Sequence, residues 1–267
     1  MANLPITPEP AATVILLREG PTSPEVLMIE RHSKSEFLPD LYVFPGGRVE
    51  EQDHALADRV AGMTRGDAAR LATTVPARSA QAFFVAAIRE TFEEAGILLA
   101  RRRGETELVR LEETGLERHR LGLQAGKTPF REIVESYDLE LAAHLLAVHA
   151  HWITPRASPR RYDTLFFTAL APRGQVARHD GIEATNHVWI RPEDALDEFQ
   201  AKKRRIILPT ALNLETLCGF DNCEDALEAS RQRPVVPVTP EVVDRDGRPT
   251  LVIPKEAGYS LTEAPTE

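Results

Sequence analysis

Two short apolar runs near the start of the chain predict a pair of strands. Residues 12–17 (ATVILL) and 25–30 (EVLMIE) are dominated by aliphatic and β-branched side chains. Gly20, Pro21 and Pro24 lie between the two runs and favour a turn. The opening of the chain is therefore expected to form two strands joined by a turn.

Further strand-like runs appear in the middle of the chain. Residues 41–44 (LYVF) predict a third strand, which Pro45-Gly46-Gly47 should end in a turn. A second strand-rich portion contains apolar runs at 150–154, 162–170 and 186–190. These runs fit strands better than helices because they are short and rich in β-branched and aromatic residues.

Helical patterns lie between these two strand-rich portions. The polar, alanine-rich stretch 54–78 contains helix-like pieces that should break at Gly62, Gly66 and Pro76. Ser79 is a candidate N-cap for the next helix, and Gly96 is a candidate stop. These two residues predict a helix between about 80 and 95.

The remaining elements complete a mixed fold. Residues 129–149 are expected to hold two helical segments, and Pro192 should open another helix because proline and acids favour a first turn. Residues 209–218 suggest one more helix, and the tail from Arg233, with its Asp246-Gly247 pair, suggests an extended segment or a hairpin. Strands and helices without regular βαβ alternation point to an α/β or α+β sandwich.

Composition and charge narrow the class of protein. The chain has 267 residues, of which 42% are hydrophobic and 27% charged, so it suits one large domain, or one domain with extensions. A net charge of −9 argues against a sequence-independent grip on nucleic acid. No apolar run reaches the roughly 20 residues that span a bilayer, and residues 1–10 do not resemble a signal peptide. A cytoplasmic protein is expected, with Cys218 and Cys223 as reduced thiols.

The segment 82–97 (AFFVAAIRETFEEAGI) carries the candidate chemistry. At about 100° per residue, apolar side chains gather on one side of a helix, at Phe84, Ile88, Phe92 and Ala95. Three carboxylates gather on the opposite side, at Glu90, Glu93 and Glu94. They repel one another by a few tenths of a kcal/mol per pair. The helix alone leaves two interpretations open: a solvated face with Arg89 nearby, or a site for hard divalent cations.

Upstream residues favour the metal site, because the sequence resembles the signature of the Nudix hydrolases. In that signature, a glycine and a glutamate precede Arg-Glu-(apolar)-x-Glu-Glu-x-Gly-(apolar). The second half matches residues 89–97 and the first half matches Gly47, but Asp53 stands where the family has glutamate. A spacer of 35 residues (54–88) replaces the usual seven, which leaves a 28-residue insertion at 54–81.

The interrupted signature narrows the resemblance to one branch of the family. His151-Trp152-Ile153-Thr154-Pro155 and the later run 161–167 (RYDTLFF) are similar to the branch that contains the mammalian nineteenth Nudix member. That branch includes peroxisomal coenzyme A diphosphatases. The resemblance covers roughly residues 12–215 and implies a Nudix-type α/β/α sandwich with a mixed sheet. We therefore expect a Nudix domain at 10–215, a helical insertion within it, and a C-terminal extension at 216–267.

The resemblance also implies roles for the acidic helix. Glu90, Glu93 and Glu94, together with the Gly46 carbonyl, would bind Mg²⁺ or Mn²⁺, and the catalytic set would include Arg89 as the residue that orients a glutamate. The substrate would be a nucleoside diphosphate linked to another group, with coenzyme A or acyl-CoA first in line. Water would attack phosphorus and break the diphosphate linkage.

Residues outside the signature are candidates for further roles. Glu183 is a candidate base or additional metal ligand, although an exposed loop acid is an equally good interpretation. Four arginines are candidates for binding phosphate, although a solvated surface position is the better interpretation of any one of them taken singly: Arg31, Arg48, Arg160 and Arg161. Family members are often dimers, so a homodimer is a further option, although no segment identifies a self-complementary surface.

Two other functions stay open on the sequence. One is hydrolysis of ADP-ribose or of a dinucleotide diphosphate. The other is a non-catalytic module that senses a nucleotide-like ligand, which the Asp53 substitution and the long insertion favour. The intact Glu90, Glu93 and Glu94 argue against a module without turnover, because a non-catalytic domain has no need of an acidic cluster that repels itself.

Overall fold

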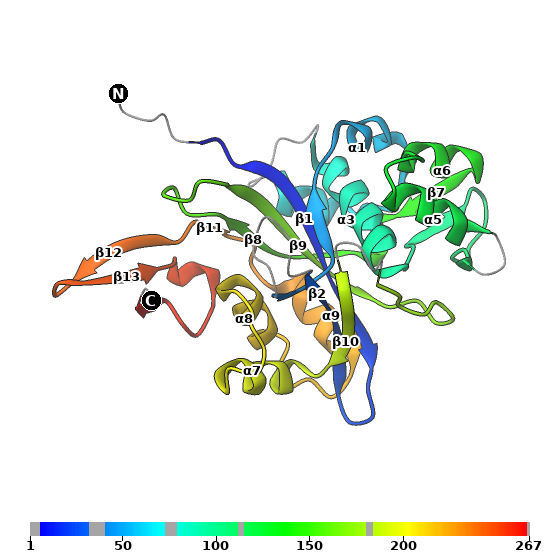
Figure 1. Cartoon of the computed structure of the whole chain (residues 1–267). Coiled ribbons are helices and arrows are strands. Elements are labelled where there is room, and N and C mark those ends of the chain that lie inside the picture. Colours follow the sequence, from blue (N-terminus) through cyan, green and yellow to red (C-terminus); the bar gives the residue numbers. More distant parts are fainter. Residues whose placement is uncertain (1–5, 32–40, 73–78, 112–114, 180–183, 266–267) are drawn as a thin grey trace.

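The computed structural model describes residues 6–31, 41–72, 79–111, 115–179 and 184–265. Within these ranges the chain forms a central mixed sheet with helices on both faces, and a small three-stranded sheet projects from one side (Figure 1). This arrangement confirms the predicted α/β sandwich. No helix in the described ranges is long and apolar enough to cross a membrane.

The central sheet has eight strands, which are β1 (Glu9–Glu19), β2 (Pro24–Arg31), β3 (Tyr42–Val43), β4 (Gly46–Arg48), β8 (Ala147–Ile153), β9 (Tyr162–Leu170), β10 (Ala184–Ile190) and β11 (Pro237–Val238). Six of them follow in the order β10-β2-β1-β9-β8-β11, while β3 pairs with β2 and β4 pairs with β1. The predicted strands at both ends of the chain are thus confirmed, and they meet in one sheet.

Strand β1 is the centre of this sheet. It pairs in parallel with β9 over nine residue pairs, from Glu9–Tyr162 to Leu17–Leu170, and antiparallel with β2 and β4. Side chains alternate across a strand, so Val14 and Leu16 enter the core on one face, while Ile15 and Leu17 enter the core on the other. A continuous apolar run is what a strand covered on both faces requires.

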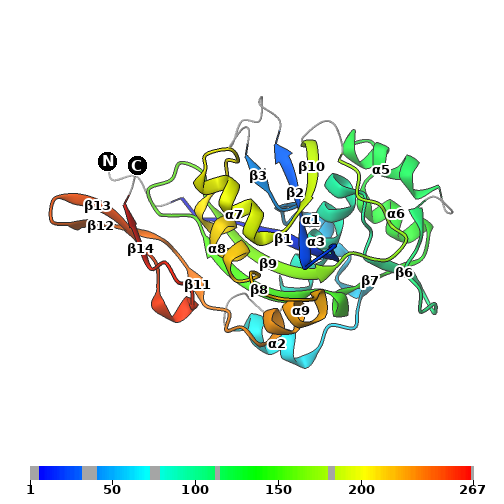
Figure 2. The same cartoon turned by 90° about the horizontal axis from the view of Figure 1, so that it is seen from below.

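Helix α3 (Ala80–Ala95) covers one face of the sheet together with α5 (Leu116–Gln124) and α6 (Phe130–Ser136). The other face packs against α7 (Pro192–Gln200), α8 (Leu208–Glu215) and α9 (Cys223–Gln232). Figure 2 shows helices on opposite sides of the strands. The two hydrophobic cores are therefore separated by the sheet.

The ends of α3 agree with the sequence prediction. Ser79 is the N-cap residue, and Gly96 ends the helix in the left-handed conformation, with φ 67°. Arg120 on α5 then satisfies the last carbonyls, because its Nε donates to Phe92 O at 2.8 Å and to Glu93 O at 3.1 Å. Most of α3 is buried on all sides, so this helix is a core element rather than an amphipathic surface helix.

Several short elements form in and just before the predicted insertion at 54–81. Helix α1 (Glu51–Ala55) leads into it, and a 3₁₀ turn (Ala57–Arg59), β5 (Val60–Ala61) and α2 (Arg65–Ala72) lie within it. The break at Gly62 is confirmed, the break at Gly66 is wrong because Gly66 lies inside α2, and Pro76 lies outside the described residues. β5 joins β7 (Leu139–Ala142) and β6 (Ala100–Arg102) in a small second sheet, so the insertion is tied to the body by strand pairing.

Two other predictions are wrong. The two glycines of the Pro-Gly-Gly segment do not form the predicted turn, because Gly46 and Gly47 pair with Thr13 and Ala12 as part of β4. Residues 129–149 hold one α-helix, α6, and only a short 3₁₀ turn (Ala143–Leu145) in place of the second helix, since most of the second apolar stretch forms β7 and the start of β8. A short apolar run does not distinguish a buried strand from a buried helix, and here pairing with other strands decides.

The C-terminal region adds α9 and a small sheet. Helix α9 was not expected, although Asn222 caps it by accepting the Asp225 N–H at 2.9 Å. The predicted hairpin is confirmed: β12 (Glu241–Arg245) and β13 (Arg248–Val252) are joined by Asp246-Gly247, both at positive φ, and β14 (Glu263–Pro265) pairs with β13. Trp152 Nε1 donates to Tyr259 Oη at 3.0 Å and fixes the tail to β8.

One buried histidine links β8 to the helices on the second face. His149 lies 3.0 Å from Ser230 Oγ through Nδ1 and 3.0 Å from Thr216 Oγ1 through Nε2. Burial lowers the pKa of His149 from 6.5 to about 3, with smaller contributions from Arg233 and Arg70. The folded protein therefore holds this imidazole neutral at every pH where the fold is used.

We predict a pH-dependent loss of stability through His149. Below pH 6.5 the unfolded chain takes up a proton that the folded chain refuses until about pH 3, so the free energy of unfolding should fall as pH falls. The expected slope from this group approaches about 1.4 kcal/mol per pH unit within that window. Urea unfolding at several pH values measures it.

Two variants test the assignment. His149→Gln should remove this part of the slope, whereas His54→Gln, at an exposed position on α1, should keep it. An unchanged slope in His149→Gln would show that other groups cause the acid sensitivity.

Candidate functional site

A buried ion pair lies on the acidic helix, which is α3, the helix that carries Glu90, Glu93 and Glu94. Arg89 on α3 donates from Nε to Asp53 Oδ1 and from Nη2 to Asp53 Oδ2, both at 2.9 Å, and neither side chain is exposed. Asp53 Oδ2 also accepts the Glu50 N–H at 2.8 Å, as part of the capping box of α1. Asp53 therefore positions Arg89 and joins the inserted segment to α3.

The same guanidinium reaches the strand and the acidic side chains. Arg89 Nη2 donates to the Arg48 carbonyl at 2.7 Å, and Nη1 donates to Glu90 Oε1 at 2.6 Å. Burial by itself would lower the pKa of Arg89, but the hydrogen bonds to Asp53 and the charges of Glu90 and Asp53 outweigh burial and raise it. Arg89 is thus a fixed cation that organises its neighbours.

The three glutamates share this region. Glu90 is half-buried, and Glu93 Oε2 lies 3.8 Å from Arg89 Nη1. Glu94 is buried and accepts the Gly46 N–H through Oε2 at 2.8 Å. Burial raises the pKa of Glu90 to about 7, with Arg89 opposing the rise and Glu93 adding to it. Carboxylates crowded in this way favour a bound cation.

The two glycines let the helix approach the strand. A Cβ on Gly47 would lie 2.4 Å from Glu90 Oε1, and a Cβ on Gly46 would lie 2.5 Å from the Ala12 carbonyl oxygen. Only glycine fits at either position without a shift. These close approaches explain why positions 46 and 47 are both glycine. The two residues lie in a strand, however, and not in a turn.

The strand register also sets the direction of the Gly46 carbonyl. Val14 N–H donates to Pro45 O, and Thr13 faces Gly46 in the next pair. In an antiparallel ladder, hydrogen-bonded and non-hydrogen-bonded pairs alternate. Because Val14 and Pro45 are hydrogen-bonded, Thr13 and Gly46 form a non-hydrogen-bonded pair. The peptide groups of Gly46 therefore point away from β1, and its N–H indeed reaches Glu94. The carbonyl is free of the β1 ladder, as the predicted metal ligand requires.

The donor set fits Mg²⁺ or Mn²⁺. All candidate ligands are oxygens, and Mg²⁺ commonly takes one or two carboxylates, with waters and substrate phosphates completing the shell. Within the described ranges, no group of three aspartate, glutamate, histidine or cysteine side chains is already placed to hold a metal ion.

The other predicted residues have different surroundings. Glu183 lies outside the described residues. Arg31 Nε is buried and has no hydrogen-bond partner within the described part of the chain, whereas Arg48 is exposed and pairs with Glu9 at 3.3 Å. Arg160 is exposed. Arg161 donates to the carbonyls of Ile6 (2.6 Å) and Thr154 (3.0 Å), which is a structural role, so the geometry lends no support to a substrate contact there.

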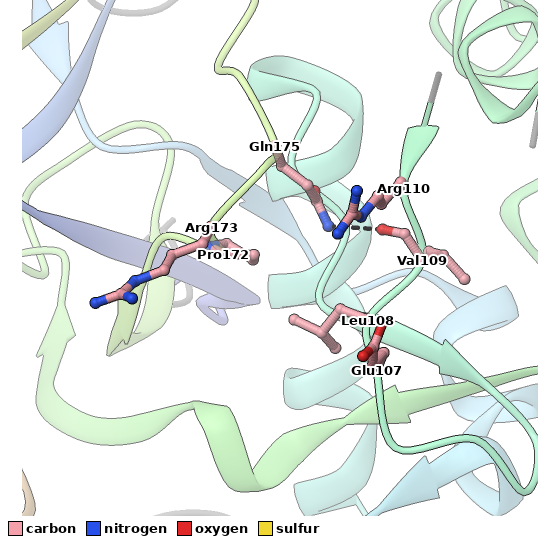
Figure 3. A pocket seen from close by; sticks show the side chains of 7 residues that line it. All are labelled: Glu107, Leu108, Val109, Arg110, Pro172, Arg173 and Gln175. Carbon is pink, nitrogen blue, oxygen red and sulfur yellow. Dashed lines mark hydrogen bonds between the residues drawn. The ribbon is translucent and has the colours of Figure 1, made fainter. Parts of the chain in front are cut away.

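A cavity of about 280 Å³ lies near the C-terminal end of α3, lined by Glu107, Leu108, Val109, Arg110, Pro172, Arg173 and Gln175 (Figure 3). The Gln175 side chain joins its two walls, because Nε2 donates to Leu98 O and Val109 O, both at 3.0 Å. No predicted site residue lines this cavity. The cavity and the acidic cluster are therefore separate features.

Sequence reasoning missed the residues that hold the end of α3. Besides Arg120, Gln124 Nε2 donates to the Glu93 carbonyl at 2.8 Å. These two side chains fix the backbone from which Glu93 and Glu94 project. Their positions, four apart on α5, are compatible with one helix face, but nothing in the sequence identifies α3 as their target.

Comparison with known proteins adds independent information. A family model for the NUDT19 Nudix domain matches residues 56–217, more than half of the chain. Acyl-coenzyme A diphosphatase NUDT19 of Gallus gallus is 31% identical over 252 residues, which cover 80% of this chain and 66% of that protein. The protein of the same name from Xenopus laevis is 27% identical over 230 residues, covering 73% and 60%. The chain spans two thirds or less of these relatives.

A solved structure gives a similar result. The crystal structure of a NUDIX hydrolase from Alicyclobacillus acidocaldarius matches with a TM-score of 0.64 and 27% identity, covering 83% of this chain and 96% of that one. These comparisons confirm the predicted resemblance and fold class. The matched family model begins after Gly46, Gly47 and Asp53, so the roles of those residues rest on the geometry described above.

We predict that Asp53→Ala destabilises the protein strongly. It leaves the Arg89 charge buried with its main partner removed, so the free energy of unfolding should fall by about 3–5 kcal/mol. Asp53→Glu keeps a carboxylate for Arg89, so its free energy of unfolding should fall by less. Urea unfolding at pH 7 measures both.

The matched control is Glu51→Ala on the same helix, where the side chain is exposed. This change should alter the free energy of unfolding by no more than about 0.5 kcal/mol. Equal losses for Asp53→Ala and Glu51→Ala would contradict the proposed role of the buried pair.

Proposed function

The chain belongs to the NUDT19 Nudix domain family, and from this premise we propose that it is a hydrolase of diphosphate linkages in nucleotide-like molecules, dependent on Mg²⁺ or Mn²⁺. The observation that carries the proposal is the close approach of Glu90 to Gly47 and of Glu94 to Gly46, with Arg89 paired to Glu90 and 3.8 Å from Glu93. The carboxylate oxygens of α3 therefore lie beside β4, where the peptide groups of Gly46 point away from β1 and toward the helix.

The chemistry follows from these donors. A divalent ion bound here would neutralise phosphate charge and increase the acidity of a bound water. Glu90, Glu93 and Glu94 would hold that ion, and the Gly46 carbonyl would complete the protein's part of the shell. Arg89 would act by positioning Glu90. The reaction consumes one water and breaks one P–O–P bond, which yields two phosphate monoesters.

The proposed substrate is coenzyme A or an acyl-CoA. Two similar proteins are named acyl-coenzyme A diphosphatases, and this chain carries the same family domain. Arg31 supports a phosphate-binding role, since its buried Nε has no hydrogen-bond partner among the described residues and arginine suits phosphate oxygens. Glu183 as a base, a homodimer and a cytoplasmic location stay predictions.

A second enzymatic candidate is hydrolysis of ADP-ribose or a dinucleotide diphosphate, because the same cluster would serve any diphosphate linkage. The non-catalytic alternative loses its main support in this structure. Asp53 differs from the family residue, yet it forms the bidentate pair with Arg89 and leaves the acidic cluster assembled.

We predict that the purified protein with Mg²⁺ converts coenzyme A to 3′,5′-ADP and 4′-phosphopantetheine. Glu94→Gln should reduce kcat/KM by about a hundredfold or more while the protein stays folded, because a neutral amide is a weaker ligand for a hard cation. Mass spectrometry of the products, with acyl-CoA, ADP-ribose and diadenosine polyphosphates in parallel, identifies the preferred substrate.

Glu132→Gln, at an exposed position on α6, is the matched control and should keep full activity. Chelation of the metal should stop turnover of every substrate in the panel. Turnover unchanged in Glu94→Gln would reject the acidic cluster as the site. Absence of metal-dependent turnover across the panel would favour the ligand-sensing alternative.

A further inference from the structure

Two histidines form a close pair at the edge of the main sheet. His179 Nδ1 lies 2.9 Å from His187 Nδ1, and the two ring centroids are 5.2 Å apart. His179 is exposed and His187 is half-buried, so solvent reaches the pair. Neither residue belongs to the acidic cluster or lines the cavity described above.

The fold holds both members of the pair in place. His187 lies on β10, opposite Ile29 of β2, and Trp189 lies opposite Leu27 two residues further on. Alternate side chains share a face, and Leu27 belongs to the core beneath α3. His187 is therefore on the α3 face. The Arg178 N–H donates to the Ala95 carbonyl at 2.8 Å and anchors the segment that carries His179 to the end of α3.

The hydrogen bond between the two Nδ1 atoms determines the tautomer of the accepting ring. One ring donates its Nδ1–H and the other accepts it, so the accepting ring carries its hydrogen on Nε2. Burial lowers the pKa of His187, followed by the charges of His179 and Arg18. Arg18 itself pairs with Glu25 Oε2 at 2.6 Å, which offsets its charge. Neutral imidazoles are the form that binds metal ions.

We propose that His179 and His187 form a binding site for a borderline divalent transition ion, such as Cu²⁺, Ni²⁺ or Zn²⁺, with both Nδ1 atoms as ligands and water completing the shell. Metal–imidazole bonds of about 2.0–2.1 Å place two nitrogens of a tetrahedral site about 3.3 Å apart. From 2.9 Å, the pair needs to open by a few tenths of an ångström, and each ring needs to turn so that its Nδ1 lone pair points at the ion instead of at the other ring.

Binding replaces the shared hydrogen with the ion. The ring that donated from Nδ1 takes its hydrogen on Nε2 by exchange with water, so both rings stay neutral and both Nδ1 lone pairs face the metal. The ligand chemistry separates this site from the acidic cluster. Imidazole favours copper, nickel and zinc, whereas the glutamate oxygens favour magnesium and manganese.

The experiment uses Cu²⁺ as the probe, in the presence of millimolar Mg²⁺. Electron paramagnetic resonance of the full chain with one equivalent of Cu²⁺ should show coupling to two imidazole nitrogens. His179→Ala and His187→Ala should each abolish the two-nitrogen signal and weaken binding by about tenfold or more in a calorimetric titration. The order of affinity should be Cu²⁺ above Ni²⁺ above Co²⁺.

Two controls locate the signal. The chain has eight histidines, and His54→Ala, at an exposed position on α1, should leave the signal unchanged. Glu94→Gln should also leave it unchanged, which distinguishes this inference from the proposed hydrolase activity. Circular dichroism confirms that the variants fold. A two-nitrogen signal that persists in His187→Ala, or Cu²⁺ that Mg²⁺ displaces, would overturn the proposal.

Discussion

The buried Arg89–Asp53 pair is the interaction on which the rest of the site depends. It joins the acidic helix to two neighbouring elements that lie about forty residues earlier in the sequence, α1 and, through the Arg48 carbonyl, strand β4. A buried guanidinium requires several acceptors at once, because each unsatisfied N–H would carry a desolvation cost. Meeting that requirement places Glu90 and Glu93 beside one cation and brings Gly46 and Gly47 beneath the helix. The geometry of the acidic cluster is thus a consequence of satisfying one arginine.

The glycine strand provides the complementary constraint. A carboxylate-bearing helix approaches a strand closely only where no Cβ intervenes, and Gly47 supplies that space for Glu90. The same strand turns the Gly46 N–H toward Glu94. Charge repulsion among the glutamates would otherwise drive the side chains into solvent. Arg89 on one side and the backbone N–H of Gly46 on the other offset part of this repulsion.

Much of this arrangement follows from local sequence, and the failures have a common cause. The strands at 12–17 and 25–30, the bounds of α3 and the hairpin at Asp246-Gly247 are set by apolar runs, a cap and turn residues, which act locally. Whether Gly46 and Gly47 form a turn or a strand depends on β1, which lies more than thirty residues earlier. The strand at 139–142 depends on β5 and β6 in the same way. The glutamates were identified from their helical spacing, but the partner of Asp53 and the anchoring of α3 by Arg120 and Gln124 are tertiary contacts that no local pattern encodes.

The parallel pairing of β1 with β9 has a consequence for how the molecule is made. The two strands are separated by more than 140 residues, and closing so long a loop costs entropy before any pairing energy returns. During synthesis β1 leaves the ribosome far ahead of β9, and its apolar side chains have no sheet neighbour on that side until residue 170 has emerged. The edge that faces β2 can pair much sooner, because β2 begins only a few residues after β1 ends. The opposite edge can gain its partner only after most of the chain has been made.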